Sequence, residues 1–338
     1  MLEELWFVLF VLIVAAYLIL DGFDMGVGML MIPMGKNDDE RRTMLNSIGP
    51  IWDGNEVWLV IAGGVLFGVF PLVYASLFSG FYLAFMLVLF VMILRTVAME
   101  FRSKEPSPRW RSFWDMVFAL ASTGLAFLLG VAFGDVLSGV PMDADGNMSV
   151  SLIGLLKPVP LLVGATTIAM FAMHGSLYLV QKTEGELQAR IRRAVPRLIA
   201  AFFVLNTLVV VAMVLFRQQI TERYVDDIWP IIFPAAALVA ILMAYRFVRQ
   251  GREFAAFLAS GATIALLVIS GALGMFPNLI ISTTDPAYNL TIYNAAAAEN
   301  TLVVCLIVAV IGLPFILAYT AGVYYFFRGK TTVDSHGY

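Results

Sequence analysis

The strongest constraint on this chain is the recurrence of apolar runs about 20 residues long, separated by short polar connections. The hydrocarbon core of a bilayer is about 30 Å thick, and a helix needs roughly 20 apolar residues to cross it. Of the 338 residues, 61% are hydrophobic and 13% are charged, so little sequence remains for a soluble domain. The sequence therefore predicts an all-α, polytopic membrane helix bundle that forms a single domain over residues 1–338.

Long apolar stretches, broken by polar, proline or glycine clusters, predict nine transmembrane helices. Their expected ranges are 5–32, 48–70, 76–99, 112–134, 159–181, 196–216, 228–248, 254–275 and 301–327. The first run lacks a basic n-region and a small-residue cleavage site, so we expect it to be a spanning helix. Two four-helix halves plus a ninth helix would fit the length, but only GVFP at 68–71 and GMFP at 274–277 favour a repeat, at positions that are not equivalent.

The basic residues predict the orientation, because lysine and arginine accumulate in cytoplasmic loops. In the nine-helix topology, 18 of the 21 basic residues fall on one side, which leaves Lys157, Arg217 and Arg223 on the other. An even number of helices would disrupt this alternation. We therefore expect the N-terminus outside and the C-terminus in the cytoplasm.

Four carboxylates and one histidine stand out within the predicted helices, where an ionisable side chain costs at least about 2.5–3.5 kcal/mol. Asp21 and Asp24 are three residues apart on the first helix, and Asp53 and Glu56 have the same spacing on the second. This spacing places each pair on one helix face. At about 1.5 Å per residue, both pairs and His174 on the fifth helix fall in a similar layer of the cytoplasmic half.

Two interpretations of these carboxylates remain open. They can be helix-end groups that cap N-termini and pair with Arg41 or Arg42. They can also form a proton-conducting or ion-binding path, because a desolvated carboxylate can take up and release protons near neutral pH. His174 can be an axial haem ligand, a proton carrier or a hydrogen-bonded packing group, although one histidine cannot supply the ligands of several haems.

Other motifs favour packing over chemistry in this chain. The small-xxx-small spacings at Gly22/Gly26 and Gly64/Gly68 predict close helix contacts. No phosphate loop, zinc-spaced cluster, G-x-S-x-G elbow or C-x-x-C-H haem attachment motif occurs, and the single Cys305 can form no intrachain disulfide. We expect no catalytic, cofactor-binding or metal-binding residue in this chain, and no nucleic-acid partner.

Several polar segments resemble subunit II of bacterial cytochrome bd quinol oxidases. They are LDGFDMGVGML at 20–30, ERRTMLNSIGPIWDGNEVWLVIAGG at 40–64, FPLVYASLFSGFY at 70–82, AMEFRSK at 98–104, AMHGSLYLVQKTEGELQAR at 172–190 and LPFILAYTAGVYYFFRGK at 313–330. They follow the family's order from one end of the chain to the other. The outer connections near 138–150 and 217–227 agree least.

The resemblance implies a multi-pass subunit of the bacterial cytoplasmic (inner) membrane that pairs with a larger subunit I. That partner carries haems b and d and the quinol site, and small accessory subunits are compatible with the family. The complex oxidises quinol and reduces dioxygen to water with protons from the cytoplasm, without pumping. The second subunit binds no haem in this family, although a structural quinone or lipid is compatible with it.

The resemblance also implies a proton route through the second subunit that uses Asp21 and Asp53; Asp24, Glu56 and His174 match the family's motifs as well. A proton-coupled secondary transporter is the alternative, because such proteins also have many helices and buried carboxylates. Transporters of that kind usually show interrupted helices at corresponding positions in two halves, and the sequence shows no such pair. A purely scaffolding membrane subunit is a third interpretation. A haem-bearing partner that copurifies with the chain would separate the oxidase from the transporter.

Overall fold

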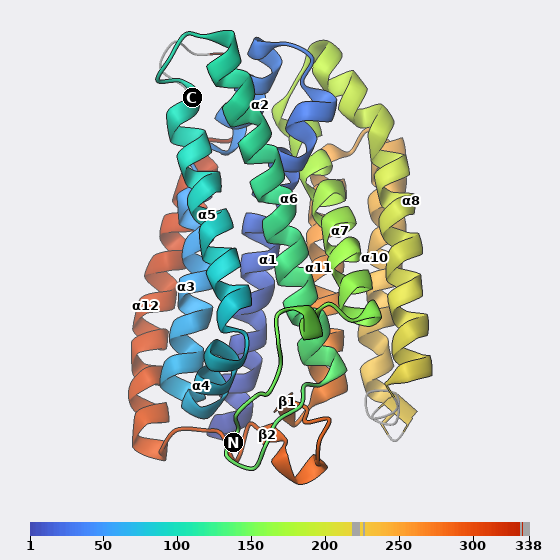
Figure 1. The fold of residues 1–338 in the computed structure, drawn as a ribbon. Coiled ribbons are helices and arrows are strands. Elements are labelled where there is room, and N and C mark those ends of the chain that lie inside the picture. The colour runs from blue at the N-terminus through green and yellow to red at the C-terminus, as the bar shows by residue number, and fades with distance from the viewer. Residues whose placement is uncertain (218–223, 226, 332, 334–338) are drawn as a thin grey trace.

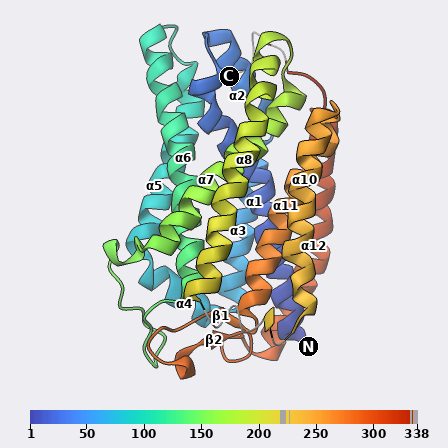
Figure 2. The ribbon, with the colours of Figure 1, turned by 90° about the vertical axis from the view of Figure 1, so that its right-hand side faces the viewer.

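Long helices stand side by side along one axis in the structure, a computed structural model that describes residues 1–217, 224–225, 227–331 and 333 (Figure 1). The two ends of the chain lie at opposite ends of the bundle, as an odd number of spans requires (Figure 1). A view turned by 90° shows the same arrangement of aligned helices (Figure 2). The predicted all-α membrane bundle is confirmed. Arg223, which was assigned to the outer side, lies outside the described residues.

The elements follow one another with short connections. The first half of the chain forms α1 (Leu2–Met34), α2 (Asp38–Ile48), α3 (Trp52–Val69), α4 (Pro71–Gly80), α5 (Tyr82–Arg102) and α6 (Pro108–Ser138). The second half forms η1 (Ile153–Leu155), α7 (Pro158–Lys182), α8 (Gly185–Phe216), η2 (Trp229–Ile231), α10 (Ile232–Arg249), α11 (Glu253–Met275), β1 (Asn278–Ile280), η3 (Pro286–Tyr288), β2 (Leu290–Thr291) and α12 (Glu299–Phe326). The short antiparallel pair of β1 and β2 lies at the end of the bundle that carries the N-terminus (Figure 1).

The predicted second and third helices differ from the structure at their starts. Within the described residues, eight helices are long and apolar enough to span a membrane, and a ninth span results when α3 and α4 are counted together. These two helices meet at 119°, and Pro71 begins α4, where its missing N–H breaks no helical hydrogen bond. The range 76–99 therefore combines part of α4 with α5. The range 48–70 joins the end of α2 to α3, although the residues around Pro50 separate the two helices.

Helix α8 begins at Gly185, well before the predicted start at residue 196. Its first turns are amphipathic, and Leu187, Ile191 and Val195 are buried at a spacing of four residues. Hydropathy alone did not predict these first turns, because charged residues separate the apolar ones. Pro196 lies inside the helix without ending it.

Helices α1 and α7 cross in backbone contact at the centre of the bundle. A Cβ atom added to Gly26 would lie 2.0 Å from the carbonyl oxygen of Phe171, and one added to Gly175 would lie 2.5 Å from the carbonyl carbon of Gly26. The expected close contact at Gly26 is therefore confirmed. This crossing brings the polar segment of α1 beside α7, which positions the site described next.

Candidate functional site

A buried ion-pair cluster joins α1, α3 and α5. Arg95 of α5 donates two hydrogen bonds to Asp21 of α1, from Nη2 to Oδ1 at 2.5 Å and from Nη1 to Oδ2 at 3.1 Å. Its Nη1 also donates to Oε1 of Glu56 on α3 at 3.0 Å. The side chains of Arg95 and Asp21 are fully buried, and that of Glu56 is 16% exposed. Because a bidentate arginine–carboxylate pair is the strong form of this interaction, Asp21 is the fixed counter-ion of Arg95.

Sequence reasoning missed this role of Arg95. Arg95 was counted among the 18 basic residues of the predicted cytoplasmic connections. This is wrong, because α5 continues to Arg102 and Arg95 lies seven residues before its end. A signal was present in the sequence. An arginine inside an apolar run requires a buried carboxylate partner, and the first two helices offered four carboxylates.

Asp24 lies next to this cluster but has no cation in contact. Asn55 donates from Nδ2 to Oδ2 of Asp24 at 2.7 Å and to the carbonyl of Leu20 at 3.3 Å. Tyr324 of α12 donates its hydroxyl to Oδ1 of Asn55 at 2.9 Å. Asp24 is fully buried, and its Oδ1 has no hydrogen-bond partner in the described structure. Three carboxyl groups thus share one guanidinium in this part of the bundle.

Asp53 is separated from the cluster, although the spacing predicted that it shares a face with Glu56. Glu56 points to Arg95, whereas Asp53 is exposed on the outer face of α3. The described residues give Asp53 no hydrogen bond or ion pair. Further along α3, Val57, Val60 and Phe67 are exposed as well, so Asp53 stands at one end of an apolar stripe.

His174 is fully buried, with contacts on both sides of its ring. Its Nε2 donates to the carbonyl of Ile19 at 3.0 Å, and its Nδ1 lies 2.7 Å from Oγ of Ser260. The ring stacks on Phe257 with centroids 4.7 Å apart and planes 5° apart. Both ring nitrogens are therefore engaged in contacts within this chain.

The cluster, His174 and their partners form one polar layer. Arg95 lies seven residues before the end of α5, Asp24 ten before the end of α1, and His174 eight before the end of α7. At about 1.5 Å per residue, these groups are roughly 10–15 Å below the helix ends near the C-terminus of the chain. The groups thus lie at a similar level along the bundle, and their place in the cytoplasmic half of the membrane stays a prediction.

A second ion-pair cluster lies at the ends of the helices, outside this layer. Arg102 is nearly fully buried and donates from Nε to Asp115 at 2.5 Å and from Nη2 to Asp38 at 2.7 Å. Burial acts to raise the pKa of Asp38, but the charges of Arg102 and Arg111 outweigh it and hold the pKa below its ordinary value of 3.8. Arg41 pairs with Asp115 at 3.0 Å, and not with a carboxylate of the first two predicted pairs.

A large cavity of about 380 Å³ opens among α1, α6, α7, α8, α10 and α11. Its lining is mostly aliphatic and aromatic, with Asn206, Thr166 and Thr167 among the few polar side chains. The cavity is therefore suited to an apolar molecule.

Across the described residues, no group of three or more His, Cys, Asp or Glu side chains is placed to hold a metal ion.

Comparison with known proteins agrees with this arrangement. Residues 2–327 match the family model of cytochrome bd terminal oxidase subunit II. The chain is 35% identical to the cytochrome bd-I ubiquinol oxidase subunit 2 of Escherichia coli (strain K12), over 98% of this chain and 96% of that protein. It is 34% identical to the cytochrome bd ubiquinol oxidase subunit 2 of Bacillus subtilis, over 98% and 97%. Its fold is similar to a chain of the bd oxidase from Geobacillus thermodenitrificans, with a TM-score of 0.80 and 14% identity over 96% of this chain and 98% of that one.

Proposed function

Because this chain belongs to the family of cytochrome bd terminal oxidase subunit II, we propose that it provides the proton-uptake route of its complex. It is a transmembrane subunit of a quinol oxidase, an oxidoreductase, and its family implies a complex with subunit I. The transporter alternative is set aside on the same ground. The proposal extends to the protons that the reduction of dioxygen to water consumes, which would enter from the cytoplasmic side of the bacterial inner membrane.

The observation that carries this proposal is the shortage of positive charge in the buried cluster. Asp21 and Glu56 contact the guanidinium of Arg95, and Asp24 lies beside them with Asn55 as its hydrogen-bond partner, so full ionisation of the three would leave two uncompensated negative charges inside the bundle. Uncompensated buried charge is costly, and a carboxyl group can remove it by binding a proton. Arg95 donates two hydrogen bonds to Asp21 and one to Glu56, and it donates none to Asp24. Glu56 and Asp24 are therefore the groups that we expect to load and release protons.

Asp53 is the carboxylate that we expect to meet the partner subunit. It lies three residues before Glu56 on α3, and its carboxylate is exposed on a face that is otherwise apolar. A carboxylate at this depth cannot face hydrocarbon without a large cost. We propose that the haem-bearing subunit I covers this face of α3 and supplies polar groups to Asp53, so that protons pass between the two subunits there. Small accessory subunits would bind elsewhere.

The chain itself is proposed to bind no haem. Both ring nitrogens of His174 are engaged, and the second histidine of the sequence, His336, lies outside the described residues. The haems b and d would therefore reside in subunit I, together with the site that oxidises quinol. In a His174→Ala complex that still assembles, selective loss of one haem absorption band would contradict this assignment.

The apolar cavity is the place where a structural quinone or lipid would fit. Its volume of about 380 Å³ is in the range of small-molecule sites, and its lining offers little hydrogen bonding. We propose that it holds the apolar part of such a molecule. Organic extraction of the purified complex followed by mass spectrometry should recover it, and a Gly271→Phe change in the lining should reduce its yield.

The proton route is tested with Asp53→Asn and Glu56→Gln in the complete complex. Each amide keeps the shape of the side chain but carries no exchangeable carboxyl proton. Where proton delivery limits turnover, each 1.4 kcal/mol added to the barrier slows quinol-dependent oxygen consumption about tenfold. Asp39→Asn is the matched control, because Asp39 is an exposed carboxylate on α2 outside the cluster. Wild-type turnover by both assembled variants would mean that protons enter by another route and that these carboxylates are structural.

A further inference from the structure

Helix α12 lies at the edge of the bundle, with partly buried side chains along one side and hydrogen bonds near both ends. Leu302 is its only fully buried residue, although the helix runs from Glu299 to Phe326. Near the start, the indole of Trp6 donates to the carbonyl of Leu302 at 3.1 Å. Near the other end, hydrogen bonds to the end of α7 hold it. Because its other side chains are only partly buried or exposed, polar contacts add to the packing that fixes the second half of α12.

These contacts are reciprocal, and we call them the C-terminal latch, formed by Lys182, Phe327, Lys330 and Thr331. Lys182 at the end of α7 donates from Nζ to the carbonyl of Phe327 at 2.5 Å. Lys330 donates from Nζ to the carbonyls of Val180 at 3.1 Å and Thr183 at 2.9 Å. The backbone N–H of Thr331 donates to the carbonyl of Lys182 at 2.8 Å. The last carbonyls of a helix lack helical partners and carry the negative end of its dipole, so a lysine is well placed there.

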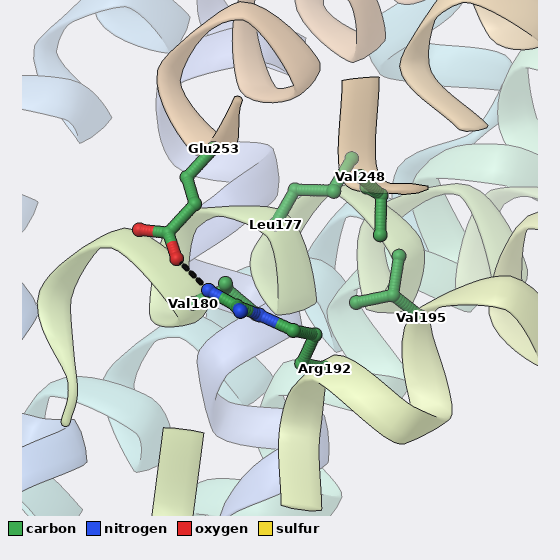
Figure 3. A pocket seen from close by; sticks show the side chains of 6 residues that line it. All are labelled: Leu177, Val180, Arg192, Val195, Val248 and Glu253. Carbon is green, nitrogen blue, oxygen red and sulfur yellow. Dashed lines mark hydrogen bonds and ion pairs between the residues drawn. The ribbon is translucent and has the colours of Figure 1, made fainter. Parts of the chain in front are cut away.

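Glu253 at the start of α11 ties the latch to two further helices. Its carboxylate accepts hydrogen bonds from Arg192 and, at 3.2 Å, from Gln188, both on α8. Its second oxygen lies 3.6 Å from Nζ of Lys330. Glu253 and Arg192 point toward one another beside aliphatic side chains of α7, α8 and α10 (Figure 3). The space between them is about 10 Å³, at the lower limit for a single water, so this junction is closely packed.

The latch leads to the carboxyl cluster through Tyr324, which lies one helical turn before Phe327. The hydroxyl of Tyr324 donates to Oδ1 of Asn55, and Asn55 in turn donates to Asp24. The Tyr324 ring meets that of Phe23 edge-on, with centroids 6.4 Å apart. No second hydrogen bond to the carboxyl group of Asp24 is found in the described structure. The orientation of that carboxyl group therefore depends on Asn55. The Asn55 amide is oriented in turn by the hydroxyl of Tyr324 at its oxygen and, more weakly, by the carbonyl of Leu20 at its nitrogen.

We infer that Tyr324 is a positioning residue for proton transfer, and that the C-terminal latch holds it in place. Tyr324 keeps the Asn55 amide group turned so that its N–H, and not its oxygen, faces Asp24. The inference rests on the proposed function above, because it assigns Asp24 a part in the proton route. It adds that the rate of proton delivery depends on the segment after α12, which lies outside the cluster itself.

The experiment uses the complete oxidase complex with Tyr324→Phe, Lys330→Met and the double variant. Arg328→Met is the matched control, because Arg328 lies in the same segment but stacks over the Tyr325 ring. We expect normal haem spectra and an unchanged KM for quinol. The kcat should fall about tenfold in Tyr324→Phe, which corresponds to about 1.4 kcal/mol for one hydrogen bond in the network. Lys330→Met should show a smaller fall, the double variant should be no slower than Tyr324→Phe, and the solvent deuterium isotope effect should rise in all three.

Lys330→Arg should restore wild-type turnover, since it keeps the charge and the donors. If Lys330→Met fails to assemble, Lys330→Gln replaces it, because its amide can still donate to one carbonyl. Wild-type kcat in Tyr324→Phe, or full additivity of the two changes, would overturn the inference. Asp24→Asn and Glu56→Gln, measured in parallel, distinguish a failure of the proposed proton route from a failure of the inference about Tyr324. If both leave turnover unchanged, the proton route itself is refuted together with the inference, whereas if only the Tyr324 and Lys330 variants are normal, the inference alone fails.

Discussion

Removing single charges from the Arg95 cluster should destabilise the complex in a defined order. Arg95→Met leaves both Asp21 and Glu56 without their cation. Asp21→Asn leaves Arg95 with Glu56 alone, at 3.0 Å. Breaking a buried ion pair from one side costs about 3–5 kcal/mol, and we place Arg95→Met at the upper end and Asp21→Asn at the lower end. Glu56→Gln removes one hydrogen bond to a charged group at a partly exposed site, for which about 1.5–3 kcal/mol is expected.

Because large membrane complexes unfold irreversibly, the measurement is the half-life of the haem-containing complex in detergent at a fixed elevated temperature. If the cluster is broken in the transition state of unfolding, a loss of about 3 kcal/mol shortens the half-life by roughly a hundredfold. The double variant Asp21→Asn/Arg95→Met should be more stable than the sum of the single changes predicts, because the two side chains are in contact. Equal half-lives for Arg95→Met and Glu56→Gln, or strict additivity in the double variant, would refute the view that Asp21 and Arg95 compensate one another.

Two further predictions concern packing and acid stability. Gly26→Ala should abolish assembly, since its Cβ would lie 2.0 Å from a carbonyl oxygen. Gly64→Leu should leave this subunit folded but weaken its association with subunit I, because a Cβ at Gly64 would meet no described atom within 4 Å beyond its own turn of α3. Normal copurification of subunit I with Gly64→Leu would contradict the proposed interface. The hydrogen bonds from Arg190 lower the pKa of Glu40 below its ordinary 4.5, so this pair contributes stability above about pH 4.5 that is lost as the pH falls through the lowered value. Thermal stability of Glu40→Gln should consequently fall less than that of the wild type between about pH 5 and pH 3, and identical acid profiles would refute this contribution.

The sequence was sufficient to predict the fold class, since each span of about 20 apolar residues has few alternatives in a membrane. It was insufficient where a span is broken. The polar helix α2 and the bend between α3 and α4 carry no hydropathy signal of their own, and Pro50 and Pro71 mark the breaks only in retrospect. Because α3 and α4 can form one interrupted span, interrupted helices do not distinguish this chain from a transporter. Its family does.

The candidate site was predicted in part. Spacing placed Asp21, Asp24 and Glu56 at one depth, and the structure brings these three together. The same spacing could not separate Asp53 from Glu56, because residues three apart on a helix differ in direction by about 60°, which suffices for one to point inward and the other outward. The partners Arg95 and Tyr324 were missed because they come from other helices, and Asn55 was missed because only ionisable side chains were considered on α3. The assignment of Asp53 and Asp21 to the proton route remains a prediction.

The start of α3 inside the bundle explains how carboxyl groups can lie there without a continuous polar helix. Helix α3 begins at Trp52, level with Asp24 on α1, so its first N–H groups and the positive end of its dipole lie within the bundle. That partial charge and Arg95 together favour negative or hydrogen-bonding groups at this depth, while the rest of α3 remains apolar. Glu56 points from this helix start toward Arg95, and Asp53 points away from it to the exposed face. In the proposed route, a proton on Glu56 would leave beside Asp53, where the described contacts offer no further acceptor from this chain. We therefore expect the partner subunit to supply the next group of that route.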